Sequence, residues 1–112
     1  MKDVLSKIVS NKRIEIERQK ELFPFSELER QLLKTDCFPS LSLKDALKNS
    51  NSGIISEFKR RSPSKGWLHK DADVNLITKE YESAGASAVS VLTDELYFGG
   101  TLFDLRMSEF HC

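Results

Sequence analysis

Two short apolar runs with a helical pattern between them constrain the fold of this chain more than any other feature. The first run extends from Ile54 to Phe58 after a turn cluster ending at Gly53, and the second covers residues 87–92. Such runs are typical of mostly buried strands. Between them, apolar residues recur at helical spacing, with Asp73 as the expected N-cap and Gly85 as the expected C-cap. This order predicts an α/β fold containing a right-handed βαβ unit with two parallel strands.

The predicted parallel sheet is incomplete. Parallel strands need cover on both faces and neighbours at both edges, yet the sequence supplies only two such strands. We therefore expect the isolated chain to be partly molten, or to associate through its exposed strand edges. Sharp, dispersed amide spectra at low concentration would contradict this expectation.

The residues before this unit predict three helices. An amphipathic helix is expected from Val4 to about Leu22, where Pro24 interrupts the pattern. Ser26 and Glu29 have the spacing of a capping box, which predicts a second helix beginning after Ser26. A third helix is expected to begin near Ser42, which is a suitable N-cap.

Composition excludes several classes of protein. The 17 basic and 17 acidic residues give a net charge of zero, which argues against a polybasic nucleic-acid arm or an acidic tail. Cys37 and Cys112 form neither a disulfide framework nor a metal-spaced set, and His69 and His111 are isolated, so no metal site is expected. Without a secretory h-region or an apolar run of ~18 residues, the expectation is a cytoplasmic protein that does not enter a membrane.

Glu57 and Lys59 are candidates for chemistry at the end of the first strand. They lie two positions apart, so their side chains project to the same face. Ligands bind at the carboxyl ends of parallel strands, where a lysine can act as an acid or anion anchor and a carboxylate can orient it. The alternative is a solvated ion pair, which on spacing alone is the commoner arrangement.

The stretch from Lys59 to Lys70 is basic and is expected to form a loop. Residues 60–66 combine cations, hydroxyls and a glycine, a composition suited to a phosphate or carboxylate, although a simple solvated turn fits equally. Phe58 and Trp67 beside these cations also resemble a single-stranded nucleic-acid surface. The neutral net charge and the shortness of the patch argue against nucleic acid as a partner.

An aromatic pair follows the second strand. Tyr97 and Phe98 precede Gly99 and Gly100, and could form a lid over a planar ligand. An aromatic residue before two glycines more often packs a loop onto the core, and that alternative stays open on the residues alone.

Three segments together resemble a known family. They are Ile55-Ser-Glu-Phe-Lys-Arg-Arg-Ser-Pro-Ser-Lys-Gly66, Tyr81-Glu-Ser-Ala-Gly-Ala-Ser-Ala-Val-Ser-Val-Leu-Thr93 and Asp94-Glu-Leu-Tyr-Phe-Gly-Gly100. In this order and spacing they resemble the N-terminal part of indole-3-glycerol phosphate synthase of tryptophan biosynthesis. The resemblance covers about Met1 to Arg106, including the helical extension that precedes the first barrel strand of that family.

The resemblance implies a fold and an activity. The family is a TIM (β/α)8 barrel, a decarboxylating lyase that closes the ring of 1-(2-carboxyphenylamino)-1-deoxyribulose 5-phosphate to give indole-3-glycerol phosphate. By resemblance Glu57 and Lys59 match catalytic residues, Ser62 matches a position in the loop over the phosphorylated substrate, and Phe98 matches an aromatic residue on its anthranilate ring. No cofactor or metal is implied.

The chain also departs from the family pattern. At 112 residues it is well short of the ~200 that a complete barrel needs, and the later strands with their catalytic residues are not in this sequence. We therefore expect a partial barrel that is inactive alone: a helical extension (1–52), the first two strands and helices (53–106) and a tail that leaves the family pattern (107–112). The alternative is a non-catalytic anion-binding or interaction module derived from the first half-site.

Overall fold

The computed structural model describes residues 3–35 and 40–108. The chain divides into two compact units, Met1–Ser40 and Leu41–Cys112, which are described separately. Cys37, His111 and Cys112, for which the sequence predicts neither a disulfide framework nor a metal site, lie outside the described residues.

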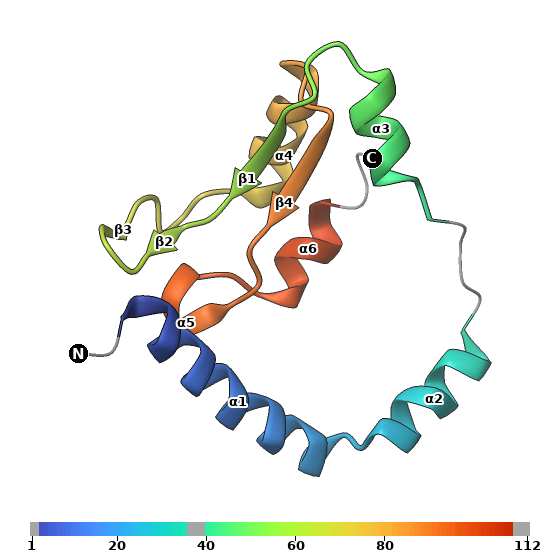
Figure 1. The fold of residues 1–112 in the computed structure, drawn as a ribbon, viewed down its shortest axis with the longest axis vertical. Coiled ribbons are helices and arrows are strands. Elements are labelled where there is room, and N and C mark those ends of the chain that lie inside the picture. Colours follow the sequence, from blue (N-terminus) through green and yellow to red (C-terminus); the bar gives the residue numbers. More distant parts are fainter. Residues whose placement is uncertain (1–2, 36–39, 109–112) are drawn as a thin grey trace. The chain divides into compact units, whose positions relative to one another are not determined.

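The described residues of the first unit form two helices. Helix α1 spans Val4–Leu22 and α2 spans Phe25–Lys34 (Figure 1). The carboxylate of Asp3 accepts a hydrogen bond from the backbone N–H of Ser6 at 2.7 Å, which caps α1 and lowers the pKa of Asp3. The helix predicted from Val4 to Leu22 is thereby confirmed.

The capping box predicted at Ser26 is wrong. Helix α2 begins at Phe25, so Ser26 already lies in its first turn, and no side chain caps the helix. Pro24 is the N-cap instead, with extended backbone, and its carbonyl accepts from the N–H groups of Glu27 and Leu28. The proline ring fixes φ near −65° and separates the two helices at this residue, which overrides the side-chain signal two positions later.

The second unit contains the predicted βαβ arrangement. Helix α3 (Leu43–Asn49) begins after Ser42, whose Oγ accepts from the backbone N–H of Asp45 at 3.1 Å, as expected. Strands β1 (Ile55–Phe58) and β4 (Ala88–Val91) pair in parallel, and helix α4 (Val74–Ser83) connects them.

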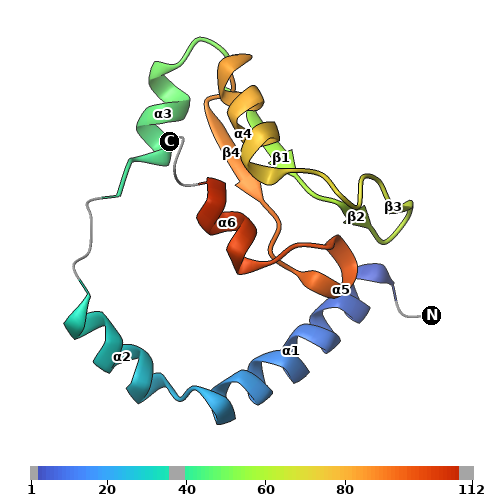
Figure 2. The ribbon, with the colours of Figure 1, turned by 180° about the vertical axis from the view of Figure 1, so that it is seen from behind.

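Helix α4 covers one face of this two-stranded sheet, as Figures 1 and 2 show from opposite sides. Helix α6 (Leu102–Ser108) packs against α4 and β4. The small core consists of three buried residues and four partly buried apolar neighbours: Phe58, Ala72 and Val74, with Ile77, Tyr81, Val91 and Met107. The fold is thus α/β with a small parallel sheet, and the described residues do not form a closed barrel.

The expected burial of the first strand is wrong in part. Phe58 is buried, but Ile54 and Ile55 remain 57% and 51% exposed, and all of β4 is half-buried. Side chains alternate along a strand, so Ile55 lies on the face opposite Phe58. Because α4 covers only the face that carries Phe58, Ile55 stays exposed although its side chain is apolar.

The caps of α4 agree with the sequence to within one residue. Asp73 Oδ1 accepts from the backbone N–H of Leu76 at 3.2 Å, so Asp73 is the N-cap. The C-cap is Ala84, and Gly85 follows it with a φ of +105°, in the region that favours glycine. Among the described residues, no helix is both long and apolar enough to span a membrane.

Candidate active site

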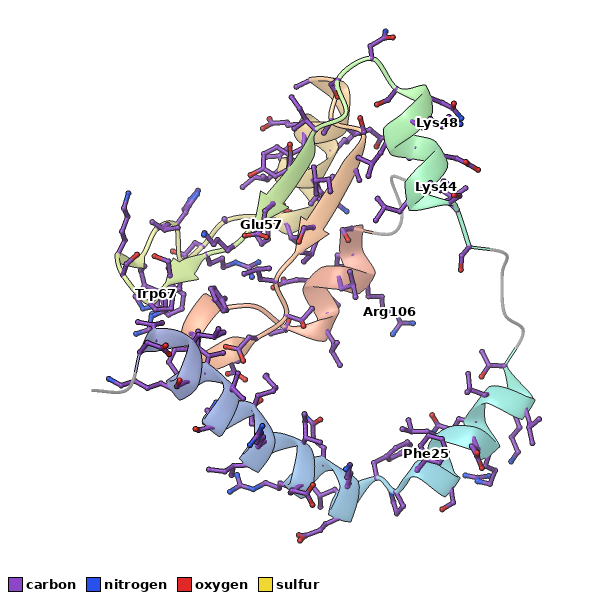
Figure 3. The ribbon with its side chains drawn as sticks, viewed as in Figure 1. Phe25, Lys44, Lys48, Glu57, Trp67 and Arg106 are labelled. Carbon is purple, nitrogen blue, oxygen red and sulfur yellow. The ribbon has the colours of Figure 1, made fainter. Side chains whose placement is uncertain are left out.

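Of the predicted pair, Glu57 lies near the carboxyl end of β1 (Figure 3), and Lys59 directly follows the last residue of that strand. Lys59 Nζ is 3.9 Å from Glu57 Oε1, and the two side chains are 38% and 46% exposed. The structure thus brings the pair together and leaves it accessible to a ligand. An ion pair of this separation and exposure contributes little to stability, so its position at the strand end is the more informative property.

A third polar group joins the pair from the neighbouring strand. Ser90 of β4 stands opposite Glu57 in the register, and its hydroxyl donates to Glu57 Oε2 at 3.3 Å. The hydroxyl of Tyr81 donates to the backbone carbonyl of Glu57, also at 3.3 Å. Ser90 is not among the site residues that the sequence predicts, because only the register of β1 and β4 shows which residue of β4 meets Glu57.

The basic loop contains a hairpin that the sequence did not predict. Strands β2 (Arg61–Ser62) and β3 (Gly66–Trp67) pair antiparallel, with Gly66 at a φ of +68°. Ser62 is buried, and its Oγ accepts from the backbone N–H of Lys65 at 3.1 Å. No hydrogen bond between described residues joins Ser62 to Glu57 or Lys59, so the hydroxyl organises the hairpin turn.

Phe98 is the last residue of a one-turn helix that the sequence also did not predict, α5 (Glu95–Phe98). Asp94 caps this turn, because its carboxylate accepts from the backbone N–H of Tyr97 at 2.9 Å. Gly99 then ends it with a left-handed φ of +65°. Phe98 is half-buried and belongs to the segment that follows the carboxyl end of β4, and Glu57 lies near the same end of the paired strand β1.

Arg60 is engaged inside the protein rather than available to an external anion. Its guanidinium donates to both carboxylate oxygens of Asp104, to the carbonyl of Ala72 at 3.0 and 3.1 Å, and to the carbonyl of Gly99 at 3.3 Å. These bonds occupy the five N–H donors that arginine possesses. The guanidinium also lies 5.0 Å from the centroid of the Phe58 ring.

Asp104 is itself fixed at the start of α6. Its carboxylate accepts from the backbone N–H of Thr101, and the hydroxyl of Thr101 accepts from the backbone N–H of Asp104, both at 3.1 Å. This reciprocal arrangement is a capping box. Arg60 and Asp104 are 16% and 6% exposed at their side chains. The residue directly after Lys59 is therefore anchored to the segment directly after Phe98.

Two other cations of the basic loop lie near an indole ring. Arg61 and Lys70 lie 5.6 and 5.4 Å from the centroid of the Trp67 ring, and Arg61 donates to the carbonyl of Leu96. The loop therefore offers fewer unengaged cations to an anion than its composition implies. In the part of the chain that the structure describes, no group of three His, Cys, Asp or Glu side chains could hold a metal ion.

Gly100 is a position where any side chain would disturb the site. A Cβ atom there would lie 1.8 Å from the carbonyl oxygen of Leu92. We expect Gly100→Ala to lower the free energy of unfolding by about 1–3 kcal/mol, because backbone rather than a flexible side chain must move. Urea denaturation would measure the change, with Ser56→Ala as a small-residue control. An unfolding midpoint equal to the parent's would contradict the prediction.

Comparison with known proteins gives one consistent result. A family model described as "Indole-3-glycerol phosphate synthase" matches residues 5–110. The chain is 50% identical over 106 residues to a protein of that name from Bacteroides thetaiotaomicron, covering 95% of this chain and 40% of the relative. Proteins of the same name from Leptospira interrogans and Campylobacter fetus are 45% and 43% identical, over 92% and 88% of this chain and 36% and 38% of their own lengths. The chain thus spans about two-fifths of these relatives.

Proposed function

Because the chain belongs to the indole-3-glycerol phosphate synthase family, we propose that it supplies the first-strand half of that family's active site. The reaction is the decarboxylating ring closure of 1-(2-carboxyphenylamino)-1-deoxyribulose 5-phosphate to indole-3-glycerol phosphate, with loss of carbon dioxide and water. The observation that carries the proposal is the accessible Glu57–Lys59 pair at the carboxyl end of β1. By this proposal residues 53–106 are the first two strands and helices of a (β/α)8 barrel.

Lys59 is the general acid in this proposal. When the aromatic carbon attacks the ketone of the substrate, negative charge develops on the ketone oxygen, and an ammonium beside it stabilises that charge and transfers a proton. The carboxylate of Glu57, 3.9 Å from the ammonium, orients it toward the oxygen. Compact, titratable lysine suits this role better than arginine, which does not release a proton near neutral pH.

Ser62 and Phe98 contact the substrate in this proposal. Phe98 is half-buried in the segment that follows the carboxyl end of β4, and in this proposal its ring packs against the anthranilate ring. Ser62 belongs to the hairpin that follows β1, so its hydroxyl reaches the substrate only if the hairpin folds over the pair. The Arg60–Asp104 anchor supports these positions because it holds the hairpin and the α5 segment together.

A chimera tests the proposal. Residues 1–106 of this chain would precede the remainder of the Bacteroides thetaiotaomicron relative, and formation of indole-3-glycerol phosphate would be followed by indole fluorescence. We expect turnover by the chimera, and none by the chain alone or by the remainder alone. A chimera that unfolds cooperatively but makes no product would refute the proposal. Calorimetric binding of a phosphorylated aryl amine to the isolated chain, without turnover by the chimera, would favour a non-catalytic anion-binding module.

A further inference from the structure

Ser90 is the residue of β4 that faces the candidate catalytic carboxylate. Residues paired in adjacent strands project to the same face of a sheet, and Ser90 is paired with Glu57. The Ser90 hydroxyl donates to Glu57 Oε2 at 3.3 Å, while Lys59 Nζ lies 3.9 Å from Oε1. Each carboxylate oxygen therefore has a different neighbouring group.

The two partners differ in how firmly they hold the carboxylate. Lys59 reaches Glu57 through a long side chain that is itself 38% exposed, at a separation too long for a hydrogen bond. Ser90 is half-buried, its side chain has one rotatable bond before the oxygen, and its backbone lies within the β1–β4 ladder. Ser90, rather than Lys59, is therefore the group able to select one orientation of the Glu57 side chain.

We propose that Ser90 is a positioning residue for Glu57. The inference rests on the proposed function, in which Glu57 in turn orients the ammonium of Lys59. A neutral hydroxyl adds no charge that would attract the anionic substrate. Loss of the hydroxyl therefore affects the chemical step more than substrate binding, and its effect depends on the carboxylate being present.

Kinetics of the chimera give the first test. We expect Ser90→Ala to lower kcat about tenfold, the equivalent of one hydrogen bond to a charged group, with KM changed by less than about twofold. Ser90→Thr keeps the hydroxyl and should recover most of the loss. In a Glu57→Gln background, Ser90→Ala should have little further effect. Ser56→Ala, a matched serine of β1 opposite Val89, should leave kcat unchanged.

A second test does not depend on turnover. In the folded chimera labelled with ¹³C-glutamate, Ser90→Ala should shift the carboxyl resonance of Glu57, and Ser90→Thr should restore it. If Ser90→Ala shifts the Glu57 resonance but the parent chimera is inactive, the proposed function is refuted while the Ser90–Glu57 contact is supported. An unchanged resonance would overturn the assignment of Ser90. So would a loss of kcat on Ser90→Ala that is as large in the Glu57→Gln background as in the parent chimera.

Discussion

Replacing Lys59 with methionine is expected to reduce kcat of the chimera by about 10²–10⁴-fold, the usual contribution of a general acid. Methionine retains the length and apolar stem of the side chain but removes both the charge and the proton. Lys59→Arg separates these two contributions, because arginine keeps the charge but does not release the proton. We expect Lys59→Arg to preserve KM within a few-fold while kcat remains low.

The matched control for this series is Lys79→Met. Lys79 is an exposed residue of α4, so its replacement removes the same charge away from the β1 strand end. Steady-state turnover and thermal unfolding of all variants would be compared. If Lys59→Met had the same kcat as Lys79→Met, Lys59 would not be the acid, and the Glu57–Lys59 pair would be an ordinary solvated ion pair.

Asp104→Ala is expected to lower the free energy of unfolding of the chimera by about 3–5 kcal/mol, which is the usual effect of removing one partner of a buried ion pair. The substitution leaves the guanidinium of Arg60, which is 16% exposed, without its carboxylate. It also removes the acceptor for the backbone N–H of Thr101 at the start of α6. Both losses act on the connection between the hairpin and the α5–α6 segment.

Two further variants make this prediction specific. Asp71→Ala removes an exposed carboxylate just before α4 and should change stability by less than about 0.5 kcal/mol. The double variant Arg60→Met/Asp104→Leu removes both charges, so it should be more stable than Asp104→Ala alone. Urea denaturation would provide the free energies of unfolding. Equal stability of Asp104→Ala and Asp71→Ala would show that the pair does not anchor the loops.

Local signals predicted much of this fold. Asp73 and Ser42 are caps because a short polar side chain before an apolar helical pattern satisfies nearby N–H groups, an interaction contained within four residues. The strand order follows from two apolar runs flanking a helix. The pairing of Glu57 with Lys59 follows from the alternation of side chains along a strand.

Features that depend on distant residues were not predictable. The strands of the β2–β3 hairpin have two residues each, which is too short to show an alternating pattern in the sequence. The sequence identifies Arg60 only as one more cation of a basic loop. Its partner Asp104 is 44 positions later, and only the fold brings the two residues together. The contact between Ser90 and Glu57 likewise depends on the β1–β4 register, and no local pattern fixes which residues of two parallel strands lie opposite each other.

In the described part of the second unit, the sheet face opposite α4 is left exposed, and this exposure links assembly of the protein to its chemistry. Ile55 and Glu57 lie on this face, and two residues along a strand are separated by only about 7 Å. Any protein segment that shields the exposed Ile55 side chain therefore also displaces water beside the carboxylate. Removing that water lowers the local dielectric constant and strengthens the attraction between Glu57 and Lys59. Exposure of the apolar Ile55 side chain to water is unfavourable in the isolated chain. Covering that side chain therefore also strengthens the ion pair between Glu57 and Lys59.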